Sequence, residues 1–175
     1  MLNHHYIAAN IFQTEKDLNG IHPIDLKFKL IDPGSESLKG PGIYFLYFKT
    51  ELVYIGYYFK GSGLDDVRTQ RWIKELATIS MRGKRVVFSK NAANAHTNCL
   101  QYPKYVGEIS DNGFETSAKR VVFADKHWKE FQSNDFLDHF NFYWFPEEKG
   151  MGRTKKELKD ITKILRKFYK PLCNG

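Results

Sequence analysis

Two tyrosines ten residues apart, Tyr44 and Tyr54, are the side chains of this sequence best suited to chemistry. They belong to the tripeptides Gly42-Ile43-Tyr44 and Tyr54-Ile55-Gly56, and the stretch between is apolar and aromatic around a polar Lys49-Thr50-Glu51. This pattern predicts a β-hairpin. A three-residue connection would place both phenols directly opposite each other on one face, whereas a two-residue turn would separate them. Two phenols near an arginine would suit phosphate chemistry.

The segment after the hairpin predicts a helix from about Leu64 to Met81, and this helix supplies the arginine. Arg71 lies on the same helical stripe as Val67, so its guanidinium is expected to point toward packed structure. Glu75 follows Arg71 by four residues, a spacing at which two side chains of a helix can form an ion pair.

The elements that must position these residues are read from hydrophobic spacing. Phe140–Phe145 is an aromatic strand, and the helix from Lys155 to Tyr169 carries apolar residues at helical spacing. The other predicted elements are a helix at Ile7–Leu18, a strand at Leu26–Leu30, two similar strands at Lys84–Phe88 and Lys119–Phe123, a loop at Asn91–Asn98 and a short helix at Trp128–Asp138. Together they predict an α+β fold, with flanking helices on a small mixed sheet.

The composition is that of a packed globular protein. A chain of 175 residues with 42% hydrophobic and 15% aromatic residues is expected to form one domain with its own core. Because neither a secretory signal nor a membrane-spanning run is visible, we expect a cytoplasmic protein without membrane contact. Cys99 and Cys173 have no metal-finger spacing and are interpreted as incidental reduced thiols.

Charge is distributed unevenly along the chain, whose net charge is +7. Residues 82–129 carry nine basic and four acidic side chains, and residues 149–175 carry nine basic and two acidic ones. Between them, residues 130–148 carry five acids and no lysine or arginine. Two basic surfaces that flank an acidic patch suit a polyanion, although a solvated helix face beside a basic loop would have the same composition.

The two tripeptides, with the elements that follow them, resemble the signature of the GIY-YIG nuclease superfamily. Arg71 resembles the arginine of the helix after the hairpin, and Glu157 resembles the glutamate of a later helix. Asn174, in Pro171-Leu172-Cys173-Asn174, resembles the asparagine of the terminal Pro-x-x-Asn. The resemblance covers residues 41–81 and 139–175. It implies a catalytic core there, with residues 1–40 as a leader and residues 82–138 as a basic insertion in a single domain, 1–175.

The resemblance implies metal-dependent hydrolysis of phosphodiester bonds, with one Mg²⁺ or Mn²⁺ per active site. Glu157 would hold the ion, since Mg²⁺ favours carboxylate oxygens. Thr154 and Glu157 also match a capping box, which would occupy the carboxylate, and Asp160 is then the alternative ligand. Glu157 therefore has a structural as well as a functional interpretation. Asn174 also has both, because it could simply cap the end of its helix.

The resemblance also assigns roles to the tyrosines and to the basic side chains near them. Tyr44 would act as general base with Tyr54 orienting it, and Arg71 would bind the non-bridging oxygens. The connection to the helix is longer than in compact members of the superfamily, so Arg68 competes with Arg71 for this role. Lys60 would supply a further positive charge.

We expect double-stranded DNA as the partner, with residues 82–138 as the candidate recognition element. The expected DNA contacts are Arg85, Lys90, Lys119, Arg120, Lys155, Lys156, Lys159 and Lys163. One active site cuts one strand, so cleavage of both strands would need a homodimer or two nicks. The function indicated is a restriction-type endonuclease. The alternatives are a structure-specific repair or recombination nuclease, or a nucleic-acid-binding protein without catalysis, because Glu75 stands where many members have a histidine.

Overall fold

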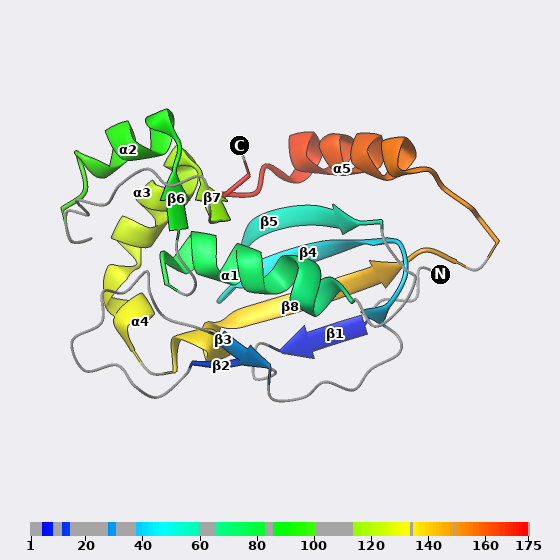
Figure 1. Cartoon of the computed structure of the whole chain (residues 1–175), viewed down its shortest axis with the longest axis horizontal. Helices are drawn as coiled ribbons and strands as arrows, with labels where there is room; N and C mark the ends of the chain where they lie inside the picture. The colour runs from blue at the N-terminus through cyan, green and yellow to red at the C-terminus, as the bar shows by residue number, and fades with distance from the viewer. Residues whose placement is uncertain are drawn as a thin grey trace.

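The computed structural model describes residues 5–8, 12–14, 28–30, 38–59, 66–82, 86–100, 114–133, 135–148 and 150–174 (Figure 1). Its strands are β1 (His5–Ala8), β2 (Phe12–Thr14), β3 (Phe28–Leu30), β4 (Gly42–Phe48), β5 (Glu51–Tyr58), β6 (Val86–Phe88), β7 (Phe114–Thr116) and β8 (Phe140–Pro146). Its helices are a π-helical turn (Arg68–Trp72) that continues into α1 (Ile73–Ser80), then α2 (Lys90–His96), α3 (Ala118–Lys126), α4 (Trp128–Gln132), a 3-10 turn (Phe136–His139) and α5 (Lys155–Tyr169). Among the described helices, none combines the length and apolar character needed to cross a bilayer.

The main sheet has four strands in the order β1-β8-β4-β5, and every neighbouring pair is antiparallel. Two smaller pairs lie outside it: β2 with β3, which are antiparallel, and β6 with β7, which are parallel. The predicted α+β class with flanking helices is confirmed, but the main sheet is antiparallel and not mixed. A direct turn of two residues joins β4 to β5, and such a turn can connect only antiparallel strands.

The hairpin turns on Lys49 and Thr50, so the connection has two residues and not three. A bulge compensates for the change of parity, because Leu46 pairs with Tyr54 whereas the next residue, Tyr47, pairs with Leu52. One extra residue of β5 therefore lies opposite this step. Without this extra residue, Tyr54 would pair with the neighbouring residue of β4, Phe45, and its side chain would project from the opposite face of the sheet.

The helix that begins with the π-helical turn covers one face of the sheet, as Figure 1 shows for α1 in front of β4 and β8. Trp72 stacks on Phe142 of β8 with ring centroids 4.5 Å apart, and it meets the Tyr44 ring edge-on at 6.4 Å. Trp72, Trp144 and Phe142 are all completely buried. Residues at alternate positions of β4 and β8 thus form an aromatic core against this helix.

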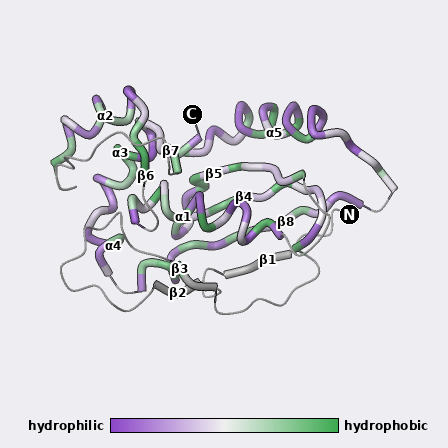
Figure 2. The backbone as a smooth tube through the Cα atoms, in the orientation of Figure 1, coloured by the Kyte–Doolittle hydropathy of each residue, from purple (hydrophilic) through white to green (hydrophobic). Residues whose placement is uncertain are grey.

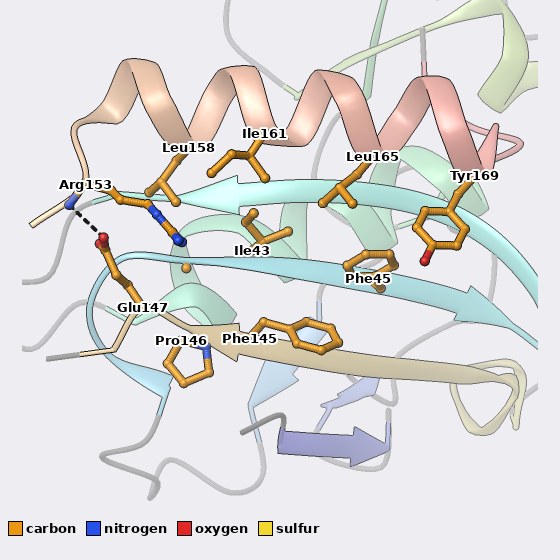
Figure 3. A pocket seen from close by; sticks show the side chains of 11 residues that line it. Ile43, Phe45, Phe145, Pro146, Glu147, Arg153, Leu158, Ile161, Leu165 and Tyr169 are labelled. Atoms are coloured by element: carbon orange, nitrogen blue, oxygen red, sulfur yellow. Dashed lines mark hydrogen bonds between the residues drawn. The ribbon is translucent and has the colours of Figure 1, made fainter. Parts of the chain in front are cut away.

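Helix α5 lies on the other face and has the bounds that its sequence predicts. It begins with a complete capping box between Thr154 and Glu157 and ends at a left-handed Lys170, whose φ is 48°. Most of the helix is hydrophilic in Figure 2. Leu158 is buried, but Ile161 and Leu165 are only half-buried. A pocket of about 370 Å³ therefore separates this part of α5 from β4 and β8 (Figure 3).

Close packing explains both glycines of the hairpin tripeptides. A Cβ atom on Gly42 would lie 2.5 Å from the Trp144 ring and 2.6 Å from the Phe145 carbonyl oxygen. A Cβ atom on Gly56 would overlap the phenol of Tyr44, which lies directly across the strand pair. The glycines are required because aromatic rings occupy the space of a side chain.

Three predicted elements differ in the structure. The predicted helix Ile7–Leu18 is wrong where it is described, because β1 and β2 occupy its first part; residues 15–18 lie outside the described ranges. The predicted loop Asn91–Asn98 is largely helix α2, whose first turn is capped by Ser89 accepting from the Ala92 amide. Three alanines favour this helix. The predictions for the hairpin and the aromatic strand Phe140–Phe145 are confirmed. The predicted helix Trp128–Asp138 is confirmed in part, because it is divided into α4, Trp128–Gln132, and a 3-10 turn, Phe136–His139.

The third difference concerns the repeated sequence Lys-Arg-Val-Val-Phe. Its first copy contributes strand β6 at Val86–Phe88, but its second copy, Lys119–Phe123, lies within helix α3. Both valine and phenylalanine tolerate either conformation, so the surrounding contacts decide. In α3 the helical spacing buries Arg120, Val121 and Phe123 and leaves Val122 exposed.

Candidate functional site

Tyr44 and Tyr54 share one face of the β4–β5 pair, as predicted only for a three-residue turn, and they are offset by two residues instead of directly opposite. Their rings are stacked, with centroids 6.1 Å apart and planes 29° apart. Tyr44 is only 1% exposed, whereas Tyr54 is half-buried. The bulge in β5 is what brings the two phenols together.

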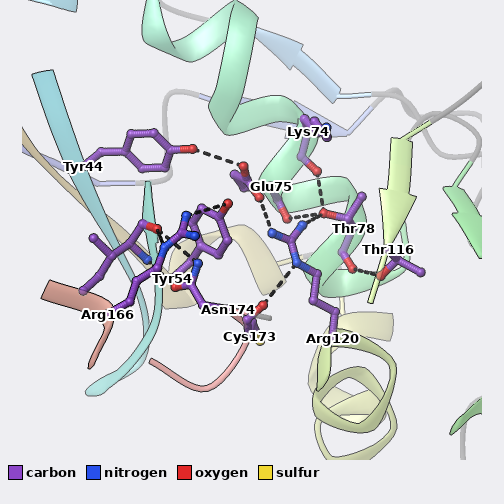
Figure 4. Close-up of polar contacts among 11 residues, drawn as sticks. Tyr44, Tyr54, Lys74, Glu75, Thr78, Thr116, Arg120, Arg166, Cys173 and Asn174 are labelled. Atoms are coloured by element: carbon purple, nitrogen blue, oxygen red, sulfur yellow. Dashed lines mark hydrogen bonds and ion pairs between the residues drawn. The ribbon is translucent and has the colours of Figure 1, made fainter. Parts of the chain in front are cut away.

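Glu75 of α1 lies between the tyrosines and a buried arginine (Figure 4). The Tyr44 hydroxyl donates to Glu75 Oε1 at 3.1 Å, and Arg120 Nη2 donates to Glu75 Oε2 at 2.6 Å. Glu75 is 4% exposed and Arg120 is 7% exposed, so this ion pair is shielded from water. The expected helical pair with Arg71 is replaced by a pair with a residue 45 positions away.

Arg120 was expected on a DNA-binding surface, but it belongs to the core. Besides Glu75, its guanidinium donates to the Thr78 hydroxyl and to the Cys173 carbonyl, and it lies 4.7 Å from the centre of the Tyr54 ring. These contacts use its donors within the protein and leave no exposed fork for a phosphate. Residues 82–138, expected to be an insertion, thus supply a buried charge to the tyrosine cluster through α3.

The end of the chain also supports Tyr54. Arg166 of α5 donates to the Ile55 carbonyl at 2.9 Å and to the Tyr54 hydroxyl at 3.4 Å. The Asn174 side chain accepts from the Ile55 amide at 2.8 Å and donates to the Ile55 carbonyl at 3.1 Å. Because β5 is an edge strand of the sheet, Asn174 pairs the outward-facing Ile55 amide and shares the Ile55 carbonyl with Arg166. Asn174 therefore positions the strand that carries Tyr54.

The environment holds both phenols in their protonated form. Burial raises the pKa of Tyr44 well above its ordinary value, and the Glu75 carboxylate raises it further by its charge and its hydrogen bond. Burial also raises the pKa of Tyr54, while the nearby Arg120, Arg166 and Arg71 lower it. At neutral pH the Tyr44 hydroxyl is thus a hydrogen-bond donor. If Tyr44 were to become a phenolate, Glu75 would have to accept its proton.

The two candidate arginines have different environments. Arg68 is buried, and its backbone amide and guanidinium both donate to the Asp66 carboxylate, with Nε 2.9 Å from Oδ2. Arg71 forms no ion pair with a described residue, and its buried Nε has no hydrogen-bond partner there. It is close enough to lower the pKa of both tyrosines. Of the two, Arg71 keeps its donors available for an anion.

Arg71 borders a polar pocket of about 210 Å³. The end of β5 supplies Tyr57, Tyr58 and Phe59, the π-helical turn supplies Gln70 and Arg71, and the start of α5 supplies Lys155. Two cations from separate elements thus meet at one small cavity. This pair of cations can bind a phosphate group or another small anion.

The proposed magnesium ligand does not fit a metal site. The Glu157 carboxylate accepts from its capping partner Thr154 at 2.6 Å from the amide and 2.8 Å from the hydroxyl, and these bonds lower its pKa. The alternative ligand, Asp160, pairs with Lys163 at 3.3 Å. No three His, Cys, Asp or Glu side chains converge anywhere in the described ranges. We therefore derive no step through a metal ion.

Most of the other expected DNA contacts are exposed side chains of helices. Lys155, Lys156, Lys159 and Lys163 are exposed on α5, and Lys90 and Lys119 are exposed on α2 and α3. Lys60 and Arg85 lie outside the described ranges. A row of four lysines on one helix is a surface that would attract a polyanion.

No family model, curated protein or solved structure matches the chain. The resemblance to the GIY-YIG superfamily accordingly depends on the hairpin tripeptides and the residues after them. Two arginines of the site, the buried Arg120 and the half-buried Arg166, could not be assigned to it from the sequence. Arg166 carried a weak signal, because it lies one residue after Leu165 of the apolar stripe, at the edge of the face that α5 turns to the sheet.

Proposed function

We propose that this protein is a DNA endonuclease that binds the phosphate backbone and hydrolyses a phosphodiester bond beside Arg71. The observation that carries the proposal is the Arg71 guanidinium, which has no ion-pair partner in the described part of the chain, shares its pocket with Lys155 and lies near two stacked tyrosines. The exposed lysines of α5 support it by extending the positive surface away from Lys155. Sequence-specific, restriction-type cleavage is the form of activity that the resemblance favours.

In this proposal the chain's own residues bind the phosphate and move one proton. Arg71 and Lys155 donate hydrogen bonds to the non-bridging oxygens and stabilise the negative charge of the transition state. The attacking water transfers a proton to the Tyr44 oxygen while the Tyr44 proton passes to Glu75 Oε1, along the existing 3.1 Å hydrogen bond. The oxygen of this water bonds to phosphorus as the bond from phosphorus to the leaving sugar oxygen breaks. The leaving oxygen takes a proton from solvent, and Glu75 later returns its proton to solvent. Arg120 positions Glu75 for this transfer.

A second candidate function is binding of nucleic acid without cleavage. The observation that favours it is the state of Tyr44, which is buried, protonated and hydrogen-bonded to a carboxylate already paired with Arg120. The phosphate pocket at Arg71 and the lysines of α5 would serve this function equally well. Only a cleavage measurement separates the two candidates.

The test combines binding and cleavage on the same preparations. Supercoiled plasmid and long linear DNA would be incubated with the full chain in Mg²⁺ and in EDTA, and affinity would be measured separately in EDTA. We expect Arg71→Ala to weaken DNA binding about 10- to 100-fold. The slope of log affinity against log salt concentration should become shallower by about one. Tyr44→Phe should abolish cleavage and leave binding intact.

The exposed Lys129→Ala variant on α4 is the matched control for loss of a single positive charge. Binding that depends on Arg71 without any cleavage would select the second candidate. Binding that is equally weakened by Arg71→Ala and Lys129→Ala would overturn the assignment of the phosphate site. No DNA binding at low salt would refute both candidates.

A further inference from the structure

The pocket at Arg71 has an aromatic side as well as a cationic side. Phe59 stands at the end of β5 and is 38% exposed, next to the half-buried Tyr57. Phe59 lines the same pocket as the two cations Arg71 and Lys155. A flat ring beside two cations is the combination that binds single nucleotides: the ring stacks on a base, and the cations bind its phosphate.

None of the described residues that line the pocket is acidic, so no carboxylate among them opposes a phosphate. The charged side chains of this lining are Arg71 and Lys155. The nearby carboxylate of Glu75 is already paired with Arg120 at 2.6 Å.

The dimensions of the pocket restrict which nucleotide can enter. A concave site of about 210 Å³ cannot admit a base that remains paired and stacked in a duplex. A base enters such a site only when it is unpaired, at a bulge, a flap or a strand end, or when it is rotated out of the helix. Unpaired bases cost least to bring into a site of this kind.

We propose that this pocket receives an unpaired nucleotide, with its phosphate between Arg71 and Lys155 and its base stacked on Phe59. The inference rests on the proposed function and narrows its substrate to DNA that carries an unpaired nucleotide next to the bound phosphate. The lysines of α5 then bind the flanking backbone.

The test measures affinity by fluorescence anisotropy in EDTA, so that cleavage does not contribute. Three labelled probes share one sequence: a paired duplex, the duplex with a single-nucleotide bulge, and the bulged duplex with an abasic site at the bulge. The full chain should bind the bulged probe at least 5-fold more tightly than the other two. Phe59→Ala should weaken binding of the bulged probe about 5- to 100-fold and leave the paired duplex unaffected.

Phe168→Ala is the matched control, because Phe168 is another exposed phenylalanine, 77% accessible, near the opposite end of α5. It should change affinity for none of the probes. Equal affinity of the full chain for paired and bulged DNA would overturn the inference while leaving the proposed function intact. A bulge preference that survives Phe59→Ala would also overturn it, and loss of all DNA binding would instead refute the proposed function.

Discussion

Replacing Arg120 with methionine removes the charge that neutralises Glu75 and keeps a side chain of similar length. Among the described residues, the Glu75 carboxylate would keep only the hydroxyl of Tyr44 as a partner, at 3.1 Å, in a site that is 4% exposed. Leaving one charge of a buried ion pair without its partner costs about 3–5 kcal/mol. At about 2–4 °C per kcal/mol for a chain of this size, the melting temperature should fall by roughly 6–20 °C.

The assay is urea unfolding of the full chain, with thermal unfolding as a second measurement. Lys119→Met is the matched control, because Lys119 precedes Arg120 on α3 and is exposed. It should change the free energy of unfolding by less than about 0.5 kcal/mol. Adding Glu75→Gln to Arg120→Met removes the unpaired charge, so the double variant should be less destabilised than the sum of the two single variants.

Two outcomes would refute this reasoning. If Arg120→Met unfolds at the same urea concentration as Lys119→Met, the arginine is not part of the core. If the effects of Arg120→Met and Glu75→Gln simply add, the two side chains do not interact. Either result would also remove the positioning role proposed for Arg120.

Two further predictions concern Tyr44. Gly56→Ala should destabilise the protein by about 1–3 kcal/mol, because the new methyl group overlaps the Tyr44 phenol. A Tyr44→Ala background should remove that cost in urea unfolding, and a cost that persists there would contradict the explanation. Because folding raises the pKa of Tyr44, the contribution of Tyr44 to stability is constant below about pH 10, where the unfolded phenol begins to ionise, and is lost above it. Tyr44→Phe should make the alkaline decline of the free energy of unfolding shallower, by the slope against pH that corresponds to one proton. An unchanged slope would refute the explanation by Tyr44.

Local sequence signals were sufficient for several elements of this protein. The hairpin, the aromatic strand and α5 were predictable because alternation, helical spacing and the Thr154 capping box act between residues close in the chain. The sharing of a face by Tyr44 and Tyr54 was also predicted, but for a three-residue turn. With the observed two-residue turn, the two tyrosines share a face only because of a bulge in β5, and no residue of the turn predicts this bulge.

The sequence by itself determined the tyrosine pair, the arginine that follows it and the basic helix at the end of the chain. Only the tertiary structure decided that Glu75 pairs with Arg120 and not with Arg71, and that a repeated pentapeptide is strand in one place and helix in another. The physical reason is that these outcomes depend on burial and on contacts between segments far apart in the chain. A buried carboxylate takes whichever cation the packing brings within reach, and sequence spacing does not encode that distance.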